Sequence, residues 1–267
     1  CHNIDRVIES KDPSKRGYKS VIWGPNDTMV GPYKDAKSPF HKTKQGEHFL
    51  QPNKLCFVCH YNGDNQYGVL VYETGMEYEQ SGSKQSCVEC HMSKKRERRV
   101  ADVPIKGYVP KIREVRDHFF MGARNGDILT KALNIDVKEK NHKLIVTLQN
   151  RTPHRVPTGF AGREVVVEIS FWKDKNLMQS VTKSLTTKYL DEKGRVTVPY
   201  LGIEKAEDNR IMPNEKRAYE VQIPQGVDSA SIAVYYRLVN KDLQKLLKID
   251  NEIFARNYEI VKVDIDL

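Results

Sequence analysis

The stretch CFVCH at residues 56–60 has a counterpart at residues 87–91, where the sequence reads CVECH. In both, two cysteines separated by two residues are followed directly by a histidine, the spacing that covalent attachment of a c-type haem requires. The cysteines form thioethers to the porphyrin, and the histidine ligates the iron from one face. Zinc knuckles and redox dithiols are the alternatives, but the histidine at the same place in both copies disfavours them. The predicted thioether donors are Cys56, Cys59, Cys87 and Cys90, and the predicted iron ligands are His60 and His91.

A third haem site is predicted at the start of the sequence, which opens with Cys1 and His2. This pair reads as the end of another attachment motif if the residues before it have been lost. Four of the five cysteines belong to the complete motifs, so Cys1 would need another partner in an oxidising compartment. The alternatives are chance and a lipidated first residue of a mature bacterial lipoprotein. We favour haem, because His2 follows the cysteine as a haem site requires, and expect two haems c with a third at the amino terminus.

The composition bounds the class of protein. A chain of 267 residues is long enough for two domains, and it contains no apolar run of membrane-spanning length. Hydrophobic residues make up 39% and charged residues 30%, so the chain is polar rather than core-rich. Haem is attached outside the cytoplasm, which predicts export to the periplasm or the extracellular space. Contact with a membrane surface is expected only if the chain is lipidated or bound in a complex.

The net charge of +9 arises from 44 Lys and Arg against 35 Asp and Glu, and taken alone it suggests an anionic partner such as nucleic acid. Haem changes this interpretation, because each haem brings two propionates that need cations. We therefore expect no nucleic-acid partner. The basic run at 94–99 is interpreted either as a partner for propionates or for an acidic redox protein, or as a solvated face.

The two halves of the chain have different patterns. Residues 1–125 hold all the cysteines and many turn signals but little periodicity, which predicts a multihaem domain of short helices and irregular loops. Helices are expected at the two motifs and through residues 111–120. Residues 126–267 hold β-branched and aromatic runs bounded by turn residues, which predict a domain of antiparallel strands. The fold class is therefore α+β and multidomain.

The second domain is predicted to be a β-sandwich of immunoglobulin-like architecture, since about seven strands at this spacing fit that fold. One helix is expected from residue 242 to about 255, before the last strand. The clear predicted strands are 144–148, 164–172, 217–223, 231–238 and 258–265, with weaker ones near 180–188 and 195–200.

A haem iron with histidine on one face either takes a second ligand or leaves a position open for substrate. Five histidines outside the motifs can fill that position: His41, His48, His118, His142 and His154. His118 is the preferred candidate, because the aromatic residues that follow it can pack on a porphyrin. His154 is the next, since the prolines on both sides restrict its backbone. Of the two upstream histidines we favour His41 over His48, and we expect His142 to be exposed.

These features resemble the exported multihaem c-type cytochromes of bacteria and archaea that pair a haem-rich amino-terminal region with a carboxy-terminal β-sandwich. The resemblance is carried by the two motifs with Met92, by Gly31-Pro32, by SPFH at 38–41 and by PHRVPTG at 153–159. It implies bis-histidine, low-potential haems stacked for electron relay. Members usually begin with a full attachment motif, so it also implies a longer precursor.

Three functions are consistent with these residues. The leading hypothesis is electron transfer through two or three closely spaced bis-histidine haems, with redox proteins as partners. The second is a reductase of a small nitrogen or sulfur oxyanion with one open haem, which the surplus of histidines disfavours. The third is a subunit of an extracellular cytochrome polymer or homo-oligomer, in which a histidine of one protomer completes a haem of the next. The chain is therefore more simply an electron carrier than an enzyme.

Overall fold

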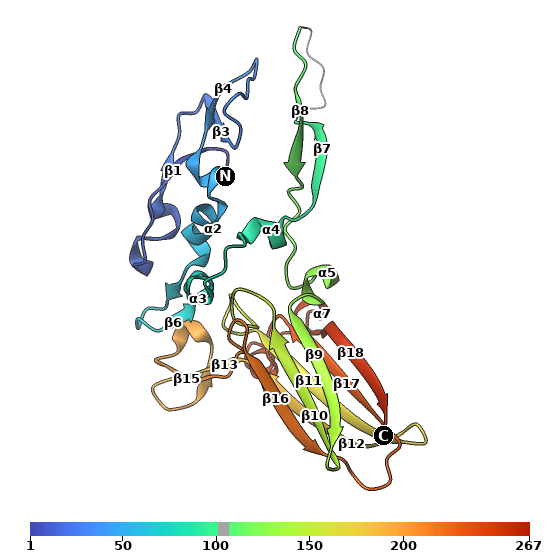
Figure 1. Cartoon of the computed structure of the whole chain (residues 1–267). Helices are drawn as coiled ribbons and strands as arrows, with labels where there is room; N and C mark the ends of the chain where they lie inside the picture. Colours follow the sequence, from blue (N-terminus) through green and yellow to red (C-terminus); the bar gives the residue numbers. More distant parts are fainter. Residues whose placement is uncertain (101–106) are drawn as a thin grey trace. The chain divides into compact units, whose positions relative to one another are not determined.

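The computed structural model describes residues 1–100 and 107–267 (Figure 1). The chain forms two compact units, the first made of Cys1–Tyr61 with Lys84–Met121 and the second of Asn62–Ser83 with Gly122–Leu267. Both haem-attachment motifs lie in the first unit, whereas the segment between them belongs to the second. This grouping differs from the single boundary after residue 125 that the sequence predicts. No helix in the described parts of the chain is both long and apolar enough to cross a membrane.

The first unit consists of short helices and two-stranded ribbons. Its elements are β1 (Ile4–Val7), η1 (Pro13–Lys15), η2 (Gly17–Ser20), β2 (Val21–Trp23), β3 (Thr28–Gly31), β4 (Lys42–Gln45), α1 (Glu47–Leu50), α2 (Pro52–His60), α4 (Cys87–His91), β7 (Lys95–Arg99) and β8 (Ile112–Arg116). The buried apolar side chains among its described residues are Ile4, Val30, Val58, Tyr61 and Met121. So small a set cannot form the core of a unit of this length, which fits the expectation that bound cofactors supply apolar mass.

The helix predicted through residues 111–120 is wrong, because β8 occupies half of this range and none of its residues is helical. β8 pairs antiparallel with β7, so the basic run is one strand of a hairpin. The directly opposite residues include the like-charged pairs Lys95 with Arg116 and Arg98 with Arg113, whereas two ion pairs link the hairpin diagonally. Lys95 lies 2.7 Å from Glu114, and Arg96 lies 2.8 Å from Asp117. Part of the basic run is therefore neutralised within its own hairpin.

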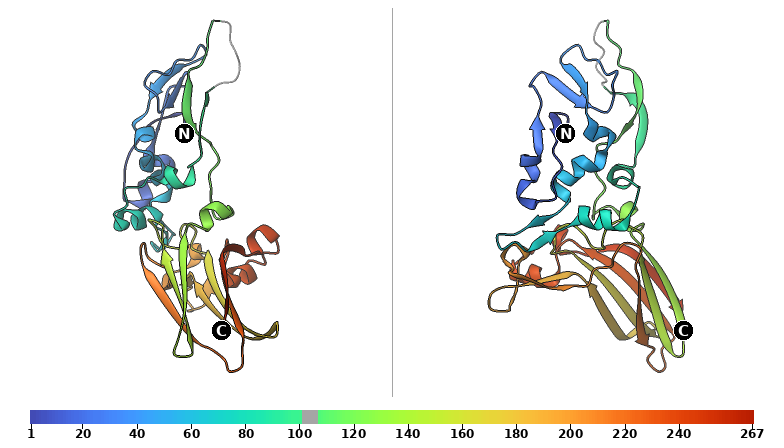
Figure 2. Two further views of the ribbon diagram at one scale, coloured as in Figure 1. Left: turned by 45° about the vertical axis from the view of Figure 1, so that its right-hand side comes forward. Right: turned by 60° about the vertical axis from the view of Figure 1, so that its left-hand side comes forward.

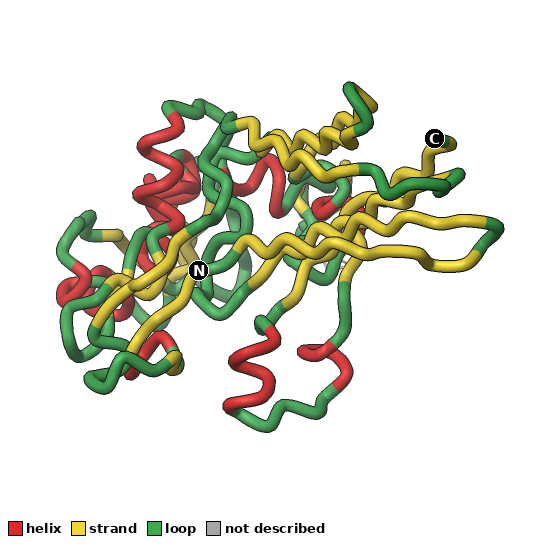
Figure 3. Tube along the Cα trace, turned by 90° about the horizontal axis from the view of Figure 1, so that it is seen from below, coloured by secondary structure: helices red, strands yellow, loops and turns green. Residues whose placement is uncertain are grey.

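The second unit is built on two antiparallel sheets (Figures 1 and 3). The four-stranded sheet has the order β12-β11-β17-β18, and the three-stranded sheet has the order β16-β10-β9. Their bounds are β9 (Leu133–Lys140), β10 (Lys143–Asn150), β11 (Glu164–Lys173), β12 (Asn176–Leu185), β16 (Lys216–Gln222), β17 (Ser229–Arg237) and β18 (Tyr258–Asp266). The five clear predicted strands coincide closely with β10, β11, β16, β17 and β18.

Both sheets contribute to one hydrophobic core. In β10 every second side chain, such as Leu144 and Val146, is fully buried, as expected for a strand with one face toward a core. β11 and β17 supply Ile169, Phe171 and Ile232. The structure thus confirms mixed α and β elements, while the immunoglobulin-like topology stays a prediction.

The remaining elements of the second unit surround these sheets. They are β5 (Gly63–Asp64), β6 (Leu70–Tyr72), α3 (Thr74–Ser81), α5 (Gly126–Leu129), β13 (Thr187–Leu190), β14 (Val196–Thr197), η3 (Pro199–Leu201), β15 (Glu204–Asp208), α6 (Lys241–Leu246) and α7 (Glu252–Ala255). The single helix predicted from 242 to 255 is wrong, because two short helices lie outside the paired strands (Figure 2). Lys248 takes a φ of 52°, which ends α6, and the Asn251 side chain caps α7.

Candidate haem sites

Both attachment motifs lie on helices. α2 ends at His60, and α4 consists of the second motif itself, Cys87–His91. Because residues three apart share a helix face, the two cysteines of each motif project on the same side. α4 starts with a capping box in which Ser86 and Glu89 satisfy each other's backbone N–H groups. The capping box therefore stabilises the short helix that carries the second motif.

The two motifs meet at their first cysteines. The Asn53 side chain, in the first turn of α2, accepts a hydrogen bond of 2.8 Å from the backbone N–H of Cys87. In the unmodified chain the interaction of the Cys56 thiol with Cys87, together with burial, raises the pKa of Cys56, and the same interaction lowers the pKa of Cys87. No cysteine of the chain is in a disulfide, so all five thiols remain for thioethers. The start of the second motif therefore lies against the helix that carries the first motif.

His91 is oriented as metal-binding histidines are. Its Nδ1 lies 2.6 Å from the carbonyl oxygen of Met121. A carbonyl can only accept, so Nδ1 carries the hydrogen and Nε2 carries the lone pair that a metal needs. The Phe120 ring stacks on the imidazole at 4.9 Å between centroids, with 7° between planes. Phe120 is exposed, as is Phe119, so both rings present apolar surface beside the motif.

His2 has the same orientation. Its Nδ1 lies 2.7 Å from the carbonyl oxygen of Val30, and its ring stacks on Phe49 at 5.0 Å. The ring centre of His118 lies 6.1 Å from that of His2. His118 is exposed, and the neighbouring Asp117 pairs with Arg96 instead of supporting the imidazole. The structure therefore brings His2 and His118 together, a pairing that the sequence left open.

The two upstream histidines differ sharply in environment. His48 is 2% exposed, and its Nε2 is buried without a hydrogen-bond partner among the described residues. Burial lowers the pKa of His48, so the ring is held neutral. His41 is exposed and its Nδ1 contacts the carbonyl of Lys42. An orphaned buried imidazole nitrogen is what an iron ligand presents, so these environments favour His48, whereas the sequence favoured His41.

His154 belongs to the second unit, in the loop after β10. Its Nδ1 contacts the hydroxyl of Thr152 at 3.1 Å and the carbonyl of Arg155 at 3.0 Å. The fully buried Asn150 holds the loop by donating to the carbonyls of His154 and Ile211. His142 lies in the hairpin turn between β9 and β10 and is exposed, as predicted. Among the other predicted residues, Cys1, Cys59 and His60 are exposed, and Cys90 is half-buried.

Sequence reasoning missed a buried network of ion pairs in the second unit. Arg210 is 2.8 Å from Glu77, 2.8 Å from Glu73 and 2.7 Å from Asp208. Lys205 is 3.0 Å from Glu73, and Arg155 is 2.6 Å from Asp208. Because Glu73 and Glu77 lie at α3, the network fixes the segment between the two motifs to the second unit. The spacing of these two acidic residues was the signal available in the sequence.

Burial acts to raise the pKa values of Glu73 and Asp208, but the network outweighs it. Lys205, Arg210 and Arg155 hold the pKa of Glu73 below its ordinary value, and a hydrogen bond from Arg210 does the same for Asp208. Both carboxylates are therefore ionised at neutral pH, as the pairing requires.

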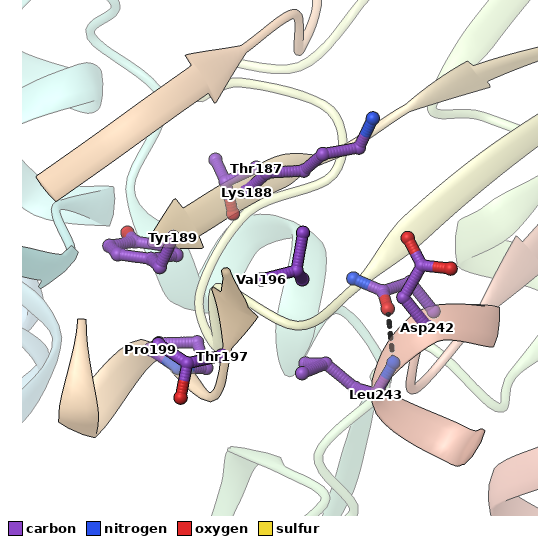
Figure 4. Close-up of a pocket in the computed structure, with 9 residues that line it drawn as sticks. Thr187, Lys188, Tyr189, Val196, Thr197, Pro199, Asp242 and Leu243 are labelled. Atoms are coloured by element: carbon purple, nitrogen blue, oxygen red, sulfur yellow. Dashed lines mark hydrogen bonds between the residues drawn. The ribbon is translucent and has the colours of Figure 1, made fainter. Parts of the chain in front are cut away.

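A shallow pocket in the second unit is lined by Thr187, Tyr189 and Leu243, among others (Figure 4). Its lining contains no cysteine or histidine. It has no part in the haem sites.

The residues present fit c-type haem. The donor set is complete at both motifs, and His91 and His2 have the tautomer that ligation needs. Within the described residues, the Nε2 of His48 is buried without a hydrogen-bond partner. No family model matches the chain, and no curated protein matches it. Among solved structures it is similar to a penta-heme cytochrome c552 from Thermochromatium tepidum, with a TM-score of 0.80, 19% sequence identity, and coverage of 100% of this chain and 75% of that one. The chain therefore has the fold of a multihaem cytochrome c.

Proposed function

We propose that the chain is an electron-transfer protein that carries c-type haems at both motifs and a third ligated by His2. The observation that carries this proposal is the packing of α2 against α4, the two helices that carry the motifs, joined by the hydrogen bond from the Cys87 N–H to the Asn53 side chain. Porphyrins attached to two helices that pack against each other would lie close together. Haem supplies reversible one-electron chemistry, and electron transfer requires short distances between centres.

The chain's own residues hold and tune these sites. The Met121 carbonyl orients His91, and the Val30 carbonyl orients His2. Exposed apolar rings at Phe119 and Phe120 offer packing surface beside the second motif. His48 and His154 are proposed as further axial ligands, which would leave no iron open. The fold likeness to a penta-heme cytochrome supports this reading.

Export to the periplasm or the extracellular space and docking to redox proteins are parts of the same proposal. Export follows from covalent haem, because haem is attached outside the cytoplasm. The exposed side of the β7 and β8 hairpin is the basic surface proposed for an acidic partner.

Intact mass and spectroscopy of the purified holoprotein test the proposal. We expect a mass increment for at least two covalent haems, low-spin six-coordinate spectra, and no binding of cyanide. A high-spin iron that binds cyanide and turns over nitrite, hydroxylamine or tetrathionate would contradict it in favour of a reductase. An iron that becomes six-coordinate only when protomers associate would instead favour the cytochrome polymer.

A further inference from the structure

His2 and His118 lie side by side although they come from near the two ends of the first unit. Their ring centres are 6.1 Å apart, and the ring planes are inclined by 39°. The sequence predicts both as iron ligands but leaves open whether they serve the same iron.

This separation is the one that two imidazoles sharing a metal ion require. Imidazole nitrogens bind metals at about 2 Å, and each ring centre lies roughly 1 Å behind its nitrogen, so rings on opposite sides of one ion have centres about 6 Å apart. The inclination of the planes is unrestricted, because each ring can turn about the axis through the metal. The observed geometry therefore meets the condition.

Contacts within the first unit position His2 and the backbone on either side of His118. The Val30 carbonyl takes the Nδ1 hydrogen of His2, which directs Nε2 to the metal, and Phe49 stacks on the same ring. His118 is exposed, but anchored residues flank it. The backbone N–H of Asp117 donates to the Lys94 carbonyl at 2.9 Å, and that of Met121 donates to the His91 carbonyl at 2.9 Å.

From these contacts we propose that His2 and His118 are the two axial ligands of one haem iron. The proposal rests on the proposed function, since it presupposes haem at the amino-terminal site. One consequence concerns the distance between this iron and the iron that His91 would ligate. The same short segment that carries His118 also supplies Phe120 and the Met121 carbonyl to His91. Residues 117–121 would thus fix the distance between two irons.

A pair of ligand variants in the full-length holoprotein tests this pairing. His118→Met is expected to give one iron per chain the charge-transfer band of histidine–methionine ligation and a higher potential. Adding His2→Ala to this variant is expected to abolish the band, because the same iron then loses its other ligand. The matched control His142→Ala, in the hairpin turn, leaves every iron low-spin.

The opposite results are equally clear. A band that persists in the double variant overturns the pairing and leaves the electron-transfer proposal intact, and so does a His118→Met protein whose irons all remain bis-histidine. Absence of covalent haem from the unaltered protein overturns the proposed function itself.

If methionine does not bind, His118→Ala provides the same test. One iron is expected to become high-spin and to return to low spin with added imidazole. Combining His118→Ala with His2→Ala should alter one iron per chain. Two altered irons would show that the residues serve different haems.

Discussion

At the residue scale, the carbonyl groups of Val30 and Met121 decide which nitrogen of His2 and of His91 can bind a metal. Each accepts the Nδ1 hydrogen of a histidine, His2 or His91, and so assigns ligation to Nε2. A backbone carbonyl in this role also makes the imidazole a stronger ligand. The motif spacing identifies the histidine, but only the folded chain supplies the carbonyl.

His48 allows a direct test at this scale. Leaving Nε2 buried without a partner costs about 1–3 kcal/mol, a cost that iron ligation removes. We expect His48→Ala to convert one low-spin iron of the holoprotein to high spin, as measured by electron paramagnetic resonance. The matched variant His41→Ala should leave all irons low-spin. The reverse outcome would restore the sequence-based preference for His41.

At the scale of elements, the attachment helices were predictable and the hairpin beside them was not. A motif with cysteines three apart fits a helix face, and Ser86 with Glu89 forms a capping box that is readable in the sequence. Residues 111–120 contain helix-compatible residues, so a helix was predicted there. β8 instead pairs antiparallel with β7, a contact between separate segments of the chain that outweighs the local preference of residues 111–120.

The capping box gives a prediction for α4. Ser86→Ala removes a side-chain acceptor at the helix start and should lower the free energy of unfolding by about 1 kcal/mol. Guanidinium unfolding followed by far-ultraviolet circular dichroism measures this loss. Ser93→Ala, at an exposed position past the end of α4, is the matched control. Equal stabilities of the two variants would show that the cap contributes nothing.

At the scale of the whole molecule, the chain alternates between two units. The motifs lie in one, while α3 and the rest of the segment between them lie in the other. The network around Arg210 holds α3 in the second unit. Because both ends of this segment continue directly into the first unit, the network limits the freedom of the chain that connects the two motifs.

This network predicts a pH dependence of the second unit. The pKa values of Glu73 and Asp208 are lowered in the folded chain, so the unfolded chain binds more protons at acidic pH. Their contribution to stability is complete above their ordinary values of 4.5 and 3.8, and is lost as the pH falls through the lower folded values. Unfolding measured between neutral and acidic pH should show this decline. Glu73→Gln is expected to weaken the dependence, and an unchanged slope would contradict the assignment.

The sequence by itself determined the cofactor chemistry and the strands, because both depend on local order: cysteine spacing for haem, and alternating apolar residues such as Leu144 and Val146 for a sheet. Only the tertiary structure decided which groups meet. The contacts of Asn53 with Cys87, of His2 with His118, and of Glu77 with Arg210 join residues far apart in the chain. No local pattern encodes such pairs, since they depend on how the whole backbone folds.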